Sequence, residues 1–132
     1  MIYIDTGAFI ARYIRKDQYH DRSVKLWEQI LSGRKLFTSN HILDETITFF
    51  MRCIGSGFAV EKANILYQTD AYKTLYSDFD VEKEGVKILA KYQDQKLSFT
   101  DCISVVLMKK NNIKNIFTFD NHFKLFGFKI LP

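Results

Sequence analysis

The chain has 132 residues, of which 47% are hydrophobic and 15% aromatic, and its one proline is the last residue. This composition excludes a disordered or collagen-like protein, and the length predicts a single domain over residues 1–132 with a core of its own. Nineteen Lys and Arg against fifteen Asp and Glu give a net charge of +4. That charge suits a polyanionic partner, although an ordinary solvated surface explains it as well.

The cysteines and the apolar segments indicate a compartment. Cys53 and Cys102 form no C-x-x-C pair and lie in apolar helical stretches, so we expect both to be reduced core residues. The chain shows no basic leader followed by a hydrophobic segment, and no apolar run long enough for a membrane span. We therefore expect a cytoplasmic protein without a membrane segment.

Strands alternate with helices along the whole chain. In the first half, hydrophobic periodicity and glycine breaks predict a strand at 1–5, helices at 6–15 and 21–31, a strand at 35–38, and helices at 40–54 and 59–69. In the second half they predict a strand at 72–76, a helix at 80–92 capped by Asp80, a buried helix opened by Ser98, a strand at 115–118, a helical turn at 121–125 and a strand at 128–131. This alternation predicts an α/β fold with a mostly parallel sheet covered on both faces.

Two carboxylates directly follow predicted strands. Asp5 ends the first strand and Asp120 follows the strand at 115–118. In parallel sheets, ligands bind beside the carboxyl ends of the strands, so these acids are expected at one edge. Thr6 follows Asp5 directly, and Thr118 lies two residues before Asp120. Their hydroxyls can orient a carboxylate or a water. Each acid taken alone is also explained as a helix or turn cap.

Two further acids belong to predicted helices. Glu45 shares an apolar stripe with Ile42 and Phe49, whereas its neighbour Asp44 points about 100° away. Asp101 stands three residues after Ser98, which is the spacing of a capping box, and it heads a helix that is apolar nearly all round. A favourable interaction with the helix dipole explains Glu45, and capping explains Asp101, without any ligand.

Four short segments occur in a specific order: Ile4-Asp5-Thr6, Leu43-Asp44-Glu45-Thr46, Leu97-Ser98-Phe99-Thr100-Asp101 and Thr118-Phe119-Asp120-Asn121-His122-Phe123. As an ordered set, they resemble the PIN-domain ribonucleases, and most closely the VapC-type toxins of toxin–antitoxin pairs. The resemblance covers essentially the whole chain. It implies a three-layer PIN-like domain with a central, mostly parallel five-stranded sheet flanked by helices.

The same resemblance implies a metal-dependent endoribonuclease. Its site would comprise the acids Asp5, Glu45, Asp101 and Asp120, supported by Thr6 and Thr118, with Mg²⁺ or Mn²⁺ as the cofactor and products that carry a 5′-phosphate and a 3′-hydroxyl. Carboxylate oxygens are the ligands that such hard cations prefer. The resemblance also implies a cognate antitoxin and a homodimer as partners.

Other features are less specific. Arg12, Arg15 and Lys16 lie near the presumed acidic edge and are candidates for binding RNA phosphates, although an exposed helix face explains them equally. The three histidines share no metal-ligand spacing, which argues against zinc. Two alternatives remain. One is a PIN-like module that binds RNA or protein without cleavage, and the other is a Mg²⁺-dependent phosphatase-type domain.

Overall fold

The computed structural model describes residues 1–132 and contains one five-stranded sheet in which all neighbouring strands are parallel. The strand order is β3-β2-β1-β4-β5. The strands are β1 (Ile2–Ile4), β2 (Leu36–Ser39), β3 (Lys73–Leu75), β4 (Asn115–Phe117) and β5 (Lys129–Leu131). The predicted α/β fold with a central five-stranded sheet is confirmed, and its sheet is parallel throughout.

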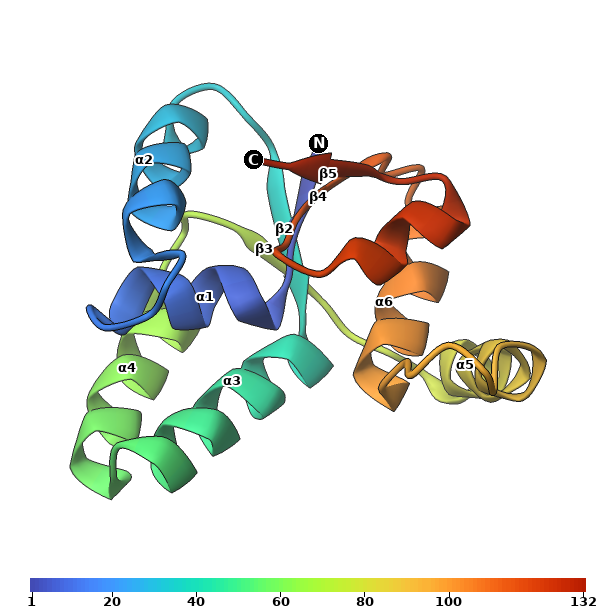
Figure 1. Cartoon of the computed structure of the whole chain (residues 1–132), viewed down its shortest axis with the longest axis horizontal. Helices are drawn as coiled ribbons and strands as arrows, with labels where there is room; N and C mark the ends of the chain where they lie inside the picture. The colour runs from blue at the N-terminus through green and yellow to red at the C-terminus, as the bar shows by residue number, and fades with distance from the viewer.

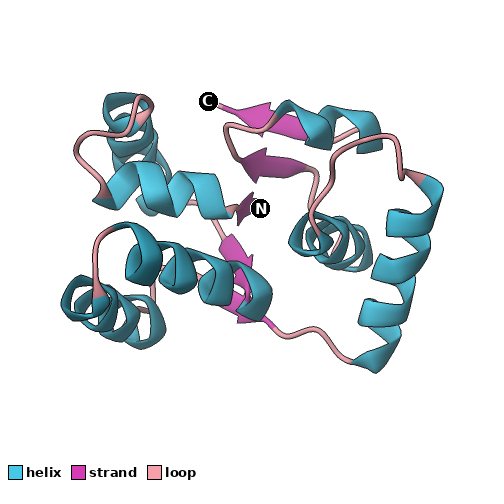
Figure 2. Cartoon of the chain, turned by 60° about the horizontal axis from the view of Figure 1, so that its bottom comes forward, coloured by secondary structure: helices cyan, strands magenta, loops and turns pink.

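Helices cover both faces of this sheet (Figures 1 and 2). The helices are α1 (Thr6–Tyr13), α2 (His20–Leu31), α3 (Asn40–Cys53), α4 (Ser56–Gln68), α5 (Phe79–Lys91) and α6 (Phe99–Lys110), with a 3₁₀ helix η1 (Asn121–Phe126). Figure 1 shows α1 to α4 on one side of the sheet and α5, α6 and η1 on the other. The chain therefore leaves the adjacent strands β1 and β4 toward opposite faces.

The core is densest around β1 and α6. All three residues of β1 are buried, as expected for the middle strand of a parallel sheet. Residues 102–108 of α6 are all buried because α6 packs between the sheet and α5. The hydroxyls of Tyr3 and Ser104, 3.1 Å apart, join β1 to α6 by a buried hydrogen bond. The start of α6 is thereby fixed relative to the carboxyl end of β1.

Some expected details of the helices are wrong. Asp78 rather than Asp80 caps α5: its Oδ1 accepts a hydrogen bond from the Val81 backbone N–H at 2.9 Å. Both aspartates suit the role, and the extended backbone at residue 78 decides between them. The apolar residues Leu31, at the end of α2, and Ile54, directly after α3, are exposed.

The two cysteines differ in burial. Both are free thiols, but only Cys102 is in the core, whereas Cys53 is exposed at the end of α3. The expectation of two core cysteines is therefore wrong for Cys53, because the last turn of α3 extends beyond the core. None of the helices is both long and apolar enough to cross a membrane.

Candidate active site

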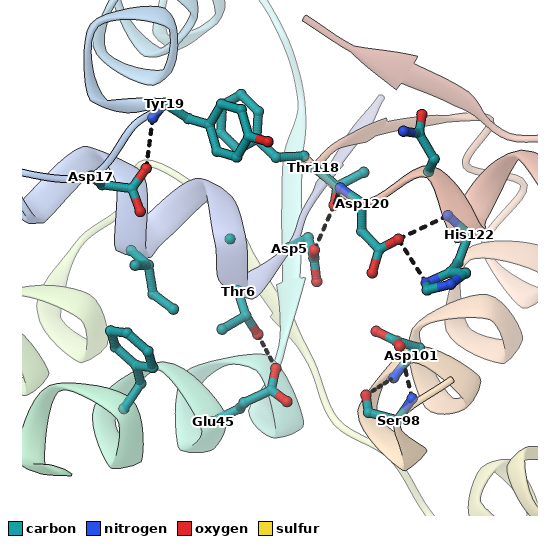
Figure 3. A pocket seen from close by; sticks show the side chains of 15 residues that line it. Asp5, Thr6, Asp17, Tyr19, Glu45, Ser98, Asp101, Thr118, Asp120 and His122 are labelled. Atoms are coloured by element: carbon teal, nitrogen blue, oxygen red, sulfur yellow. Dashed lines mark hydrogen bonds and ion pairs between the residues drawn. The ribbon is translucent and has the colours of Figure 1, made fainter. Parts of the chain in front are cut away.

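A cavity of about 760 Å³ opens at the carboxyl ends of β1 and β4 (Figure 3). Because the chain leaves these adjacent strands toward opposite faces of the sheet, a crevice forms between the segments that follow them. The cavity is lined by Asp5, Thr6, Gly7, Ile10, Asp17, Tyr19, Glu45, Phe49, Ser98, Asp101, Thr118, Phe119, Asp120, Asn121 and His122. The four acids predicted from the sequence thus share one cavity, although they belong to four separate segments.

Asp5 is the most buried of these acids, with 7% of its surface exposed. Its side chain does not cap α1; instead, Oδ2 accepts a hydrogen bond of 2.6 Å from the Thr118 hydroxyl. Burial, assisted by the nearby charge of Asp101, raises the pKa of Asp5 to about 7 despite this hydrogen bond. The cap explanation for Asp5 is therefore wrong, and its carboxyl titrates near neutral pH.

Glu45 reaches the cavity from the second turn of α3. Its Oε2 accepts a hydrogen bond from the Thr6 hydroxyl. Burial raises the pKa of Glu45, and the charges of Asp101 and Asp44 add to this effect. Asp44 is itself exposed and does not line the cavity, as its different helical direction predicts.

Asp101 combines a cap with a place in the cavity. Its Oδ2 accepts from the Ser98 backbone N–H at 2.9 Å, while the Ser98 hydroxyl accepts from the Asp101 N–H at 3.1 Å. This reciprocal capping box opens α6. Burial raises the pKa of Asp101, with a further contribution from the charge of Asp120. Both interpretations of Asp101 are therefore compatible.

Asp120 lies between β4 and η1 and closes the ring of acids. Its Oδ1 accepts from the His122 backbone N–H at 2.8 Å and lies 2.7 Å from the ring Nδ1 of His122. The ring contact has the distance of an ion pair but not the geometry of a hydrogen bond. The Thr118 hydroxyl accepts from the Asp120 N–H at 3.0 Å while it donates to Asp5. Thr118 thus connects the two acids that follow the strands.

The four acids share one arrangement (Figure 3). In each, one carboxylate oxygen takes part in the hydrogen bonds just described, and the other has no side-chain partner. No Lys or Arg forms an ion pair with any of them. Hard oxygen donors with uncompensated charge fit a divalent cation such as Mg²⁺. As the side chains stand, no three of them are close enough to hold one ion, so joint ligation requires side-chain rotation.

Comparison with known proteins agrees with this geometry. The family model described as "PIN domain" matches residues 2–129. The chain belongs to the PIN-domain family. It is 31% identical over 128 residues to the "23S rRNA-specific endonuclease VapC20" of Mycobacterium tuberculosis, a match that covers 97% of this chain and 95% of that protein. It is also 31% identical over 126 residues to a "VapC ribonuclease" of Archaeoglobus fulgidus, covering 92% and 78% of the two chains.

Solved PIN-domain structures support the same conclusion. The crystal structure of the M. tuberculosis VapC20 toxin, described as cleaving the sarcin–ricin loop, matches with a TM-score of 0.91 and 28% identity over the full length of both chains. FitAcB from Neisseria gonorrhoeae matches with a TM-score of 0.74 over 100% of this chain and 97% of its own. At 16% identity, the second match shows the fold alone. The predicted resemblance to VapC-type PIN-domain ribonucleases is confirmed.

The cavity of this PIN domain also contains residues that sequence reasoning missed. Asp17 is a fifth acid in its wall, and its Oδ1 accepts a hydrogen bond from the Tyr19 N–H at 2.8 Å. Asp17 stands in a polar loop and adjoins no apolar run, so the pattern that identified the other acids could not find it. The basic candidates Arg12, Arg15 and Lys16 do not line the cavity. The guanidinium of Arg12 lies 4.7 Å from the centre of a buried tryptophan ring instead.

Proposed function

We propose that this PIN-domain protein is a metal-dependent endoribonuclease whose catalytic acids are Asp5, Glu45, Asp101 and Asp120. The observation that carries the proposal is the gathering of these carboxylates in one cavity without a Lys or Arg counter-ion. Bare carboxylates repel a phosphate, so the phosphate to be cleaved can lie among them only if a cation offsets their charge. Membership among VapC-type ribonucleases supports the same activity.

Each acid has a distinct proposed role. Asp5 and Asp101 are the proposed ligands of Mg²⁺ or Mn²⁺, since both are held firmly by one oxygen and leave the other without a side-chain partner. When bound, the cation supplies positive charge that polarises the phosphate to be cleaved. Glu45, which accepts a hydrogen bond from Thr6, would either bind the cation directly or orient the attacking water. Asp120 would bind the cation through a bridging water, or it would hold a second ion.

Thr6 and Thr118 are the proposed supporting residues. Their hydroxyls donate to Glu45 and Asp5, respectively, which favours the ionised form of each acid. The effect opposes burial, which favours the protonated form. These hydroxyls thereby increase the fraction of carboxylates that can bind a cation near neutral pH.

Substitution of the acids tests the nuclease proposal directly. The wild-type protein should shorten RNA in Mn²⁺ and leave it intact in EDTA, whereas Asp5→Asn and Asp101→Asn should fold and fail to cleave. Asp44→Asn is the matched control because Asp44 is exposed and lies outside the cavity. A cavity variant that still cuts RNA would refute the assignment. Intact RNA with every protein, wild type included, would favour a binding module, and release of phosphate from a small ester would favour a phosphatase.

We also propose that residues 1–132 form one PIN domain that acts in the cytoplasm as the toxin of a toxin–antitoxin pair. Ribosomal RNA is the first substrate to test, because the name of the M. tuberculosis relative specifies 23S rRNA. Incubation with intact ribosomes, followed by mapping of new RNA 5′ ends, identifies the substrate and the cleavage site. Cleavage of transfer RNA with untouched ribosomal RNA would redirect the substrate proposal without affecting the nuclease itself.

An antitoxin and a second copy of the chain are the proposed protein partners. The outer sides of α3 and α4 carry several exposed apolar residues, namely Met51, Ile54, Val60, Ile65 and Tyr67. Exposed apolar patches of this kind are typical of protein interfaces. Light scattering of the purified protein tests the homodimer, and a monomer at high concentration would refute it.

A further inference from the structure

A pair of stacked aromatic rings forms one rim of the acidic cavity. Tyr19, from the loop between α1 and α2, and Phe119, which follows β4, have ring centroids 4.3 Å apart and ring planes 3° apart. Both rings are half-buried, and both line the acidic cavity. Figure 3 shows Tyr19 at the rim of this cavity. The Phe119 ring also packs edge-on against the buried ring of Phe117, with the two ring centroids 6.0 Å apart. The stack is therefore anchored in the core while it remains accessible from the cavity.

The ring of Tyr19 has few interactions within the protein. Phe119 is its only aromatic partner, and no cation of the chain lies over it. The hydrogen bond from its N–H to Asp17 fixes the backbone at this position. A fixed, half-exposed aromatic ring beside a phosphate-cleaving cavity is a platform on which an RNA base can stack.

Beyond this pair, a second cavity of about 280 Å³ has the opposite charge. It shares Tyr19, Thr118, Phe119 and Asn121 with the acidic cavity, so the two cavities adjoin at these residues. Its remaining lining comprises Arg22, Lys124, Ile130 and Pro132, with no Asp or Glu side chain. Both cations are exposed, and neither forms an ion pair. The Arg22 guanidinium carbon lies 5.7 Å from the centre of the Phe119 ring, so cation and platform are adjacent.

The other neighbour of the acidic cavity offers no such site. A cavity of about 340 Å³ on the α3 side contains Arg52, but it also contains the acids Asp44 and Glu45. In that cavity a phosphate would be attracted by one cation and repelled by two carboxylates. The charge distribution thus favours one exit for a polyanionic strand, over the aromatic pair and toward the two unpaired cations.

We propose that Tyr19, Phe119, Arg22 and Lys124 form a subsite for a nucleotide next to the cleaved bond of the RNA. A base stacks on Tyr19, and the adjoining phosphate binds Arg22 and Lys124. The proposal rests on the proposed ribonuclease function, because it takes the acidic cavity as the place of cleavage. It assigns the phosphate contacts to side chains from α2 and η1, which adjoin the cavity, rather than to the end of α1.

The test measures binding of a fluorescein-labelled oligouridylate in EDTA at several salt concentrations, with intact RNA verified on a gel. The double variant Arg22→Ala/Lys124→Ala should bind more weakly and reduce the slope of log K against log salt by about 0.7, since the two cations share one phosphate and each phosphate neutralised on a single strand contributes about 0.7. The matched control is Arg34→Ala/Lys114→Ala, which removes the same charge from residues before β2 and β4, at the opposite edge of the sheet. It should leave the slope unchanged.

Tyr19→Leu separates stacking from charge. This variant keeps an apolar contact with Phe119 but loses the aromatic platform, so binding should weaken about tenfold while the salt slope stays at the wild-type value. Thermal unfolding of every variant verifies that the fold is retained. Equal losses in the double variant and its control, or no loss in either, would overturn the subsite.

The outcomes also distinguish this proposal from the nuclease proposal. Cleavage of the same oligonucleotide in Mn²⁺ by the wild type, with equal rates and binding in all variants, overturns the subsite and leaves the nuclease standing. Residue-dependent binding as predicted, with ribosomal and transfer RNA that also stay intact in Mn²⁺, supports the RNA contacts of these four residues and overturns the nuclease. A wild-type protein that does not bind the oligonucleotide at all overturns the subsite.

Discussion

Replacement of Asp5 by asparagine should stabilise the metal-free protein at alkaline pH. Burial raises the pKa of Asp5 from 3.8 to about 7. Between pH 4 and 7, roughly, the folded protein retains a proton that the unfolded chain has released. The free energy of unfolding therefore falls as the pH rises through this window and is constant above it. A difference of about three pKa units corresponds to as much as about 4 kcal/mol.

The asparagine side chain removes this penalty because it carries no charge, while its carbonyl oxygen can still accept the Thr118 hydrogen bond. In EDTA at about pH 8, Asp5→Asn should therefore unfold at a higher urea concentration than the wild type, and near pH 4 the two should unfold together. Glu45 and Asp101 titrate in both proteins, so the difference between the two curves reports the charge of Asp5, including its repulsion of these two acids.

The control for this experiment is Asp70→Asn, an exposed aspartate outside the cavity that should follow the wild type at every pH. Addition of Mn²⁺ at about pH 8 should raise the stability of the wild type more than that of Asp5→Asn, since a cation that binds the folded protein stabilises it. If the difference in unfolding free energy between the wild type and Asp5→Asn were the same from acid to alkaline pH, the argument that burial raises the pKa of Asp5 would be refuted.

Three further substitutions test the surroundings of the acids. Thr118→Val removes a donor that favours ionised Asp5, so its pKa should rise further and the cleavage-rate profile should shift to higher pH; an unshifted profile would contradict this role. Gly85→Val should lower the free energy of unfolding in urea by about 1–3 kcal/mol, because a Cβ at this position would lie 2.7 Å from Cδ1 of Ile103. An unchanged stability would show that α5 and α6 move apart enough to accept the larger side chain. Ser98→Ala removes the cap of α6 and should cost about 1 kcal/mol in the same assay, against no change for an exposed serine such as Ser32.

The sequence predicts the acidic edge because of a simple geometric property. Parallel strands end at a common edge, so acids that follow two strands, Asp5 and Asp120, must lie on it once the alternation of strands and helices is recognised. Glu45 was predicted from its place in an apolar helical stripe, and Asp101 from its place at the start of an apolar helix. All four predictions of position use local patterns that extend over a few residues.

What the sequence does not predict depends on contacts between distant segments. The order of the strands decides that β1 and β4 are neighbours, and no local pattern contains that order. Arg22 and Lys124 line the same cavity because α2 and η1 both border it, although they are about a hundred residues apart in the chain. The sequence-based candidates Arg12, Arg15 and Lys16 were instead chosen because they follow Asp5 closely in the chain. Asp17 was missed for the same reason, since a polar loop carries no signal of what it faces.

Capping and ligand binding, which the sequence presents as alternatives for each acid, are complementary in the folded chain. The capping box uses one oxygen of Asp101, and the turn at η1 uses one oxygen of Asp120, so each side chain is held in place by local structure. Holding the carboxylates close together is costly, because burial and mutual repulsion raise the pKa of three of the four. Local hydrogen bonds and the buried core offset that cost. The second oxygen of each acid needs no partner for the fold, and it is therefore available to a cation.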